Sequence, residues 1–129
     1  MSLRSESSTS TLRSDHDALV ALTESVMTRV RAGIPEGVAE AIADLQARVA
    51  AHLDAEEREV IPGYTSYAPE DARALLGDHG KIRGALAELD VAVDLHLVRA
   101  NALEAFLATL RAHAAREDTG LYRWAEEHR

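Results

Sequence analysis

Residues 38–56 read VAEAIADLQARVAAHLDAE, and the side chains that decide the fold recur there at intervals of four and three residues. The members of this stripe are Val38, Ile42, Leu45, Val49, His52 and Glu56. This spacing places all six on one face of an α-helix, as in a helix that packs lengthwise against others in a bundle. A stripe that faces a core should be apolar throughout, yet its last two members are polar.

The preceding segment shows a weaker stripe of the same kind, from about Leu12 to Ala32. We expect residues 33–35, Gly-Ile-Pro, to end this first helix and to start the second, because proline suits a first helical position. Pro62-Gly63 should stop the second helix and be followed by a loop up to Pro69.

Two more helices are predicted in the second half of the chain. One begins near Pro69 and carries His79 on its stripe, and the other carries Phe106, Leu110, His113, Glu117, Leu121 and Trp124. A turn between them is expected near residues 94–98, although neither Gly nor Pro marks it.

This pattern predicts an all-α fold, an antiparallel up-down-up-down four-helix bundle over residues 12–128. A length of 129 residues suits one domain. Aromatic residues make up only 4% of the chain and alanine and leucine are abundant, which favours helices over strands. Residues 1–11 are rich in Ser and Thr without periodicity, so we expect a flexible N-terminal tail.

Composition also bounds the function. The chain has no cysteine, which excludes zinc fingers, iron–sulfur clusters and thiol nucleophiles. Its net charge of -8 argues against nucleic acid as a partner. No apolar run approaches the ~18 residues of a membrane span, and residues 1–11 lack the apolar stretch of a signal peptide. We therefore expect a soluble, cytoplasmic protein without a membrane partner.

Histidine interrupts all four stripes, and glutamate interrupts two of them. The residues concerned are His16, His52, Glu56, His79, His113 and Glu117. Each glutamate follows a histidine by four residues, so that imidazole and carboxylate share one helix face. The midpoint between His16 and His52 is residue 34, inside the first expected turn, so antiparallel helices bring these two histidines to one level. The chain also repeats itself, because Asp-His pairs at 15–16 and 78–79 each precede a His-x-x-x-Glu helix.

A metal site explains this set better than independent core residues do. A lone histidine on a stripe is usually a hydrogen-bonded core residue, but buried carboxylates are costly without a partner. A dinuclear site would compensate all six side chains at once. Imidazole and carboxylate donors suit iron, manganese or zinc, and two carboxylates on different helices are placed to bridge two ions. His96, in the far turn, and His128, near the C-terminus, are not expected to be ligands.

The pattern His16 … His52-x-x-x-Glu56 … His79 … His113-x-x-x-Glu117 resembles the hemerythrin family in its bacterial HHE cation-binding form, over residues 12 to about 125. The resemblance implies a hemerythrin-like bundle with a non-haem di-iron centre, so two iron ions are favoured over manganese or zinc. It implies that the histidines are terminal ligands and that both glutamates bridge. It also implies reaction with or sensing of O2, peroxide or nitric oxide, or iron handling. Whether the protein is an enzyme stays open, and a hydrolase is not implied.

The chain departs from the oxygen-carrying members of the family. Those proteins have a second histidine one turn after the third-helix ligand, where this chain has Arg83. They end in His-x-x-x-x-Asp, and Asp118 also follows His113 here, although Glu117 lies better on the helix face. Asp118 and Glu57 are therefore second-choice ligands or neighbours of the ligands. The resemblance is closer to branches linked to iron sensing, nitric oxide or peroxide responses, and repair of iron centres.

Other interpretations remain. A ferritin-like oxidase would need Glu-x-x-His on two helices, and no glutamate lies three residues before any stripe histidine. A histidine phosphotransfer module would need an exposed histidine, for which His79 in HGKIRG is the candidate; a helical interaction bundle without metal is a further alternative. The three tyrosines, Tyr64, Tyr67 and Tyr122, are expected to pack at the solvent edge, with a phenolate ligand as an open alternative.

Overall fold

The computed structural model describes residues 2–128, with side chains from residue 9 onward. Helices account for almost all of this part of the chain, which contains no strand. The helices are α1 (Ser2–Arg31), α2 (Val38–Glu59), α3 (Ile61–Tyr67), α4 (Pro69–Asp94), α5 (Ala100–Thr119) and α6 (Leu121–Glu127). The all-α prediction is confirmed.

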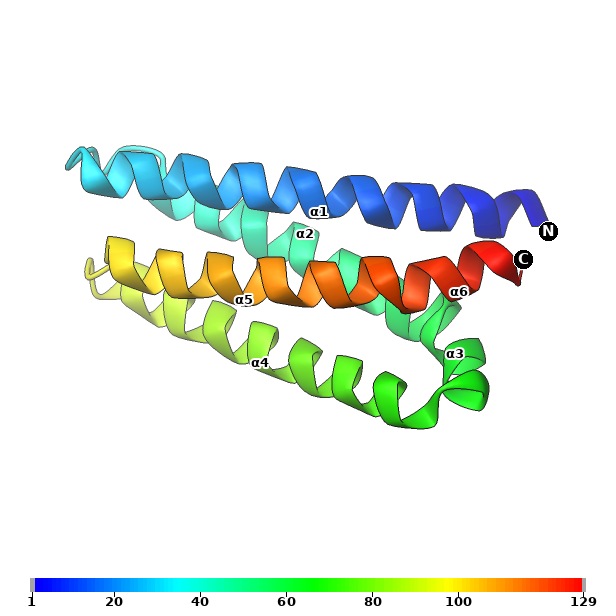
Figure 1. Cartoon of the computed structure of the whole chain (residues 1–129). Helices are drawn as coiled ribbons and strands as arrows, with labels where there is room; N and C mark the ends of the chain where they lie inside the picture. Colours follow the sequence, from blue (N-terminus) through cyan, green and yellow to red (C-terminus); the bar gives the residue numbers. More distant parts are fainter. Residues whose placement is uncertain (1, 129) are drawn as a thin grey trace.

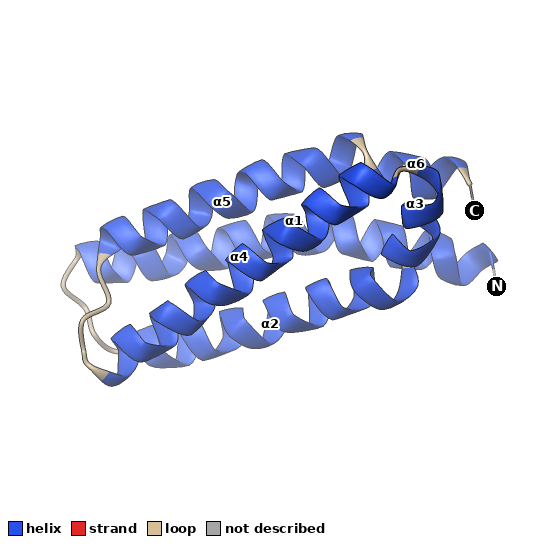
Figure 2. Cartoon of the chain, turned by 90° about the horizontal axis from the view of Figure 1, so that it is seen from below, coloured by secondary structure: helices blue, strands red, loops and turns tan. Residues whose placement is uncertain are grey.

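The four long helices lie lengthwise beside one another, as Figure 1 shows. Helix α1 packs against α2 and α5, and α4 packs against the same two helices. The connections from α1 to α2 and from α4 to α5 lie at one end, while α3 and α6 lie at the other (Figure 2). Each half of the chain therefore consists of two long helices followed by a helix of seven residues.

Two predicted helix starts were wrong. Helix α1 begins at Ser2 and not near Leu12. Thr9 and Leu12 are both buried, and packing at this end of the helix outweighs the low helix propensity of Ser and Thr. Helix α2 begins at Val38 and not at Pro35, because Gly37 adopts a left-handed conformation with φ of 81° in front of it.

The ends of two helices also differ from expectation. Helix α3 includes Pro62-Gly63 and most of the segment that was expected to be a loop, and Pro62 is tolerated there because it lies in the first turn. The last predicted helix is interrupted at Gly120, which separates α5 from α6. By contrast, α4 starts at Pro69 and the turn at residues 95–99 matches the expected one.

The core consists of two apolar clusters. The larger includes Leu19, Val26, Ile42, Leu45, Leu86, Leu103 and Phe106. The smaller includes Leu12, Val60, Ile61, Tyr64, Leu75, Leu121 and Tyr122. On α1, Leu12 and Leu19 of the two clusters lie on either side of His16. The polar members of the stripes therefore lie between two apolar layers that exclude water.

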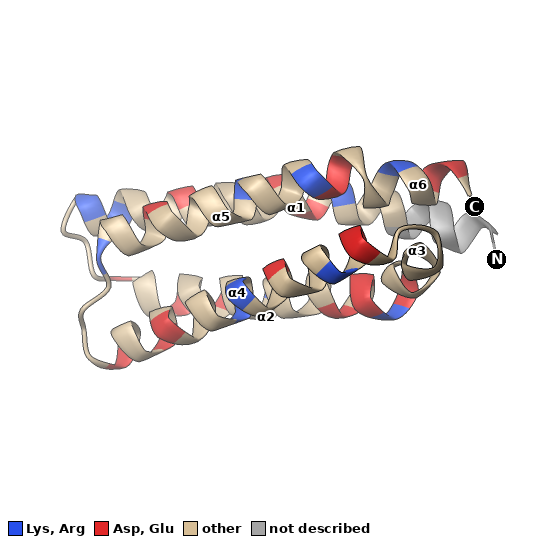
Figure 3. Cartoon of the chain, turned by 60° about the horizontal axis from the view of Figure 1, so that its bottom comes forward, with Lys and Arg blue, Asp and Glu red and all other residues tan. Residues whose placement is uncertain are grey.

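Charged residues of both signs are interspersed along the long helices (Figure 3). Within residues 2–128, no helix is both long and apolar enough to cross a membrane.

Candidate metal centre

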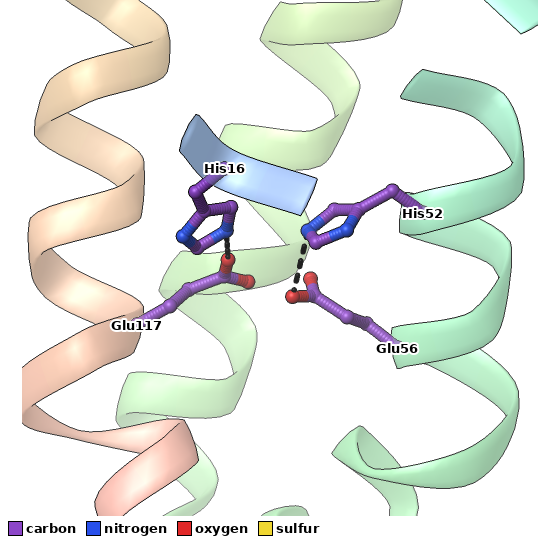
Figure 4. Close-up of side chains that lie close together, drawn as sticks. All are labelled: His16, His52, Glu56 and Glu117. Atoms are coloured by element: carbon purple, nitrogen blue, oxygen red, sulfur yellow. Dashed lines mark hydrogen bonds and ion pairs between the residues drawn. The ribbon is translucent and has the colours of Figure 1, made fainter. Parts of the chain in front are cut away.

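The structure brings all six predicted residues together inside the bundle. They form two groups, in each of which the ligand atoms lie within 4.8 Å of one another. Group one consists of His16, His52, Glu56 and Glu117, and group two of His79, His113, Glu56 and Glu117. Both groups are buried, and both contain the same two carboxylates. Figure 4 shows the side chains of group one pointing toward one another from α1, α2 and α5.

Each shared carboxylate lies between histidines of both groups. Glu117 Oε1 is 3.0 Å from His16 Nε2, and Glu117 Oε2 is 2.9 Å from His113 Nε2. Glu56 Oε2 is 3.1 Å from His52 Nε2, and Glu56 Oε1 is 3.0 Å from His79 Nε2. In each shared carboxylate, one oxygen faces a histidine of group one and the other faces a histidine of group two. A carboxylate that bridges two ions requires this arrangement.

The outer nitrogen of each histidine faces a carboxylate on a neighbouring helix. The Nδ1 pairs are His52 with Asp15 (3.1 Å), His79 with Glu57 (2.7 Å), His113 with Asp78 (3.0 Å) and His16 with Asp118 (3.8 Å). Such contacts fix the tautomer and orientation of metal-binding imidazoles, leaving Nε2 free to face the metal. Glu57 and Asp118 thus lie behind the histidines, outside both groups. The roles of Asp15 and Asp78 were not predicted.

Arginines hold three of these outer carboxylates. Arg83 Nη1 is 2.7 Å from Glu57 Oε2, and its other nitrogen binds Asp54. Arg116 lies 3.3 Å from Asp78, and Arg13 lies 3.2 Å from Asp118. Arg83 therefore takes part in the outer contacts and supplies no ligand.

The pKa values express how strongly these groups depend on one another. Burial alone would lower the pKa of His79, but pairing with Glu117 and with two further carboxylates raises it to about 10. Burial alone would raise the pKa of Glu117, but pairing with three imidazoles, that of His113 first, holds it well below its usual range. In the absence of a metal ion, protons on the imidazoles therefore balance the buried carboxylates.

The donor set fits a metal pair. His16 Nδ1, Glu56 Oε1 and His113 Nε2 are buried without a hydrogen-bond partner. Although Glu117 lies 2.9 Å from His113 Nε2, the two are not aligned for a hydrogen bond. An unsatisfied buried polar atom costs about 1–3 kcal/mol. Coordination to a metal ion would satisfy Glu56 Oε1 and His113 Nε2, which both lie inside group two. Nitrogen and oxygen donors of this kind suit iron, manganese or zinc.

Sequence reasoning missed the position of Tyr122. This side chain is fully buried, and its hydroxyl donates a hydrogen bond to Glu56 Oε2. Burial, followed by the negative charges of Glu117 and Glu56, raises the pKa of Tyr122 well above its usual range. Solvent-edge packing was therefore wrong for Tyr122. It was also wrong for Tyr64, which is buried and donates to Asp71, whereas Tyr67 is 64% exposed.

The break at Gly120 explains why periodicity missed Tyr122. On an uninterrupted helix, a residue five positions after Glu117 would lie about 140° away from it. A Cβ atom at residue 120 would lie 3.1 Å from both Tyr64 Oη and Asp71 Oδ2, which favours glycine there. At Gly120 the backbone leaves helical geometry, with φ of -114° and ψ of -83°, and Tyr122 of α6 then lies in the centre. The available signal was Gly120 itself, a residue of low helix propensity three positions after Glu117.

The remaining histidines lie away from both groups, as expected. His96 is in the turn at the far end, with φ of 55°, and His128 follows α6 and pairs with the Trp124 carbonyl oxygen.

A family model described as the hemerythrin HHE cation binding domain matches residues 7–125. The matched region covers nearly the whole chain and contains both groups, in agreement with the resemblance noted in the sequence. No curated protein and no solved structure shows a significant match to the chain.

Proposed function

Because the chain belongs to the hemerythrin HHE cation-binding family, we propose that it holds a non-haem di-iron centre in an antiparallel four-helix bundle with two repeated halves. One observation carries this proposal: two buried His/Glu groups share Glu56 and Glu117. Because the two groups share both carboxylates, they suit two neighbouring ions that are bridged better than two ions bound at unconnected sites.

The residues of the chain have distinct tasks in this proposal. The Nε2 atoms of the four histidines are terminal donors, and the two glutamates are bridges. The outer carboxylates keep each imidazole oriented, and the apolar clusters on either side keep bulk water out. A bound iron pair supplies one-electron redox chemistry and open coordination positions for small oxidants. Iron is preferred to manganese or zinc because of the family, since the donor set itself admits all three.

We infer that the partners are small molecules such as O2, peroxide or nitric oxide, and that oxygen is not carried reversibly. Arg83 stands four residues after His79, where oxygen carriers have a further histidine. Its guanidinium binds Glu57 and Asp54 outside the centre. Residue 83 therefore supplies no imidazole to the centre. Air should therefore oxidise the ferrous protein to a ferric form that persists after deoxygenation. Stopped-flow absorbance over repeated cycles tests this, and a spectrum that returns to its starting form would contradict it.

The burial of His79 argues against a phosphotransfer module. A phosphorylated histidine must meet a partner protein at the surface, whereas His79 is 0% exposed. Its two nitrogens face Glu56 and Glu57.

The decisive experiment is metal stoichiometry. After anaerobic reconstitution with ferrous iron and removal of excess metal, elemental analysis should give two irons per chain. His96→Asn is the matched control, because it removes a histidine outside both groups and asparagine tolerates the left-handed conformation there. It should also retain two irons. One iron or none in the unmodified protein would refute the di-iron proposal.

A further inference from the structure

The hydroxyl of Tyr122 lies among the donor atoms of group one. It is 3.1 Å from His16 Nε2, 3.4 Å from His52 Nε2 and 3.2 Å from Glu117 Oε1. It also donates a hydrogen bond to Glu56 Oε2. The hydroxyl therefore contacts all four members of group one, and within residues 2–128 it has no hydrogen bond to His79 or His113.

These separations are those of neighbouring ligands around one ion. Nitrogen and oxygen donors lie about 2.0–2.2 Å from a first-row metal ion, so adjacent donors at right angles are about 3 Å apart. A phenol that served only to satisfy one carboxylate would need one such contact. Tyr122 has four, and two of them are with imidazole nitrogens that already face a carboxylate.

The internal repeat shows that this tyrosine is specific to one half of the chain. Tyr122 follows Glu117 by five residues and lies at the start of α6, and Ile61 follows Glu56 by five residues and lies at the start of α3. Both are buried. An apolar residue is thus sufficient at this position in the first half, whereas the second half places a polar oxygen in the interior, where it requires a partner.

Packing holds the phenol ring in this position. The ring of His16 lies 5.3 Å away, centroid to centroid, and the guanidinium carbon of Arg13 lies 5.3 Å from the ring centroid. Arg13 also binds Asp118 of α5 and Glu126 of α6. These contacts connect α1 to both α5 and α6 next to Gly120. They hold the Tyr122 hydroxyl in a fixed direction.

We propose that Tyr122 is a ligand of the ion bound by His16 and His52. This inference rests on the proposed di-iron function. As the bond between the metal and the phenolate oxygen forms, the phenol O–H bond breaks and its proton is released to solvent, without any change in oxidation state. Group one then has five donors and group two has four, so the two ions differ although the histidines and glutamates repeat.

Spectroscopy of the fully loaded ferric protein tests the proposal. Phenolate bound to ferric iron gives an intense charge-transfer band in the visible region, with phenolate ring vibrations in the resonance Raman spectrum. Tyr122→Phe keeps the ring and its packing and should lose both signals. Tyr64→Phe is the matched control, because Tyr64 is also buried in the smaller apolar cluster but donates to Asp71. It should keep both signals.

Proton release gives a second measurement that does not depend on colour. On loading with ferric iron in weak buffer, the unmodified protein and Tyr64→Phe should each release one more proton per chain than Tyr122→Phe. Two bound irons without the phenolate signals, or equal proton release from Tyr122→Phe, would overturn this inference and leave the di-iron proposal intact. Failure to bind two irons would overturn both.

Discussion

Removing a shared carboxylate should have a different effect from removing a terminal histidine. His113 belongs to group two alone, whereas Glu117 belongs to both groups and places one oxygen 3.0 Å from His16 and the other 2.9 Å from His113. His113→Ala should therefore still hold about one iron, in group one. Glu117→Ala should bind iron only weakly at both groups, because each group loses a donor and the two ions lose a shared carboxylate.

The stability of the loaded protein should follow the same order. A metal at 100 times its dissociation constant stabilises a folded protein by about 2.7 kcal/mol per site, so two occupied sites contribute roughly 5 kcal/mol. For a domain of this length, 1 kcal/mol corresponds to roughly 3–5 °C in melting temperature. Iron should therefore raise the melting temperature by about 20 °C in the unmodified protein, by about 10 °C in His113→Ala, and by almost nothing in Glu117→Ala.

The assay compares each variant with itself, with iron and with chelator, by thermal unfolding and elemental analysis. This difference removes the effect of each substitution on the metal-free bundle, where the buried ion pairs also change. His96→Asn should behave as the unmodified protein does. If His113→Ala lost both irons, or if Glu117→Ala kept one with its full thermal shift, then the carboxylates would not be shared in the manner described.

Two further predictions concern the outer contacts and the protons. Asp78→Asn should lower iron affinity about 10–100-fold while two irons still bind at saturation, because Asp78 orients His113 from 3.0 Å; competition with a chelator measures this, and Asp44→Asn, at an exposed pair with Arg48, should change nothing. In the metal-free protein, the pKa of His79 is raised from 6.5 to about 10, so its proton stabilises the fold fully below pH 6.5. Urea unfolding with chelator should show a free energy that falls from pH 6.5 to 10, and a level or rising free energy would contradict the pairing.

The positions of the four histidines and two glutamates of the centre were predictable because they depend only on helical spacing and hairpin geometry. The midpoint at residue 34 falls inside the observed turn between α1 and α2, so His16 and His52 do meet, with ring centroids 4.9 Å apart. His79 and His113 meet at the same distance. Small errors in helix ends do not disturb this geometry, because the ligands lie well inside the long helices.

The outer carboxylates could not be predicted in the same way. Asp15 precedes His16 by one residue and therefore lies about 100° around the helix, away from the stripe. Its partner is His52 on the adjacent helix, and a contact between two helices has no periodic signature in either. Tyr122 was missed for a related reason, since its direction depends on the break at Gly120 and not on the phase of α5.

The four contacts between an outer carboxylate and a histidine connect the four long helices in a ring, and one of these contacts is longer than the others. Each long helix presents one carboxylate to the histidine of the next, and three of the four distances are 3.1 Å or less. The fourth, from Asp118 on α5 to His16 Nδ1 on α1, is 3.8 Å, and that nitrogen has no hydrogen-bond partner. Rotation of any helix would disturb both the contact it makes and the one it receives, so ligand geometry and helix packing determine each other.

At the long contact between Asp118 and His16, Arg13 and Tyr122 connect α1 to α5 and α6 instead. The tyrosine therefore stands where His16 is held least firmly by its own carboxylate, and where an additional donor would do most to define the coordination of group one.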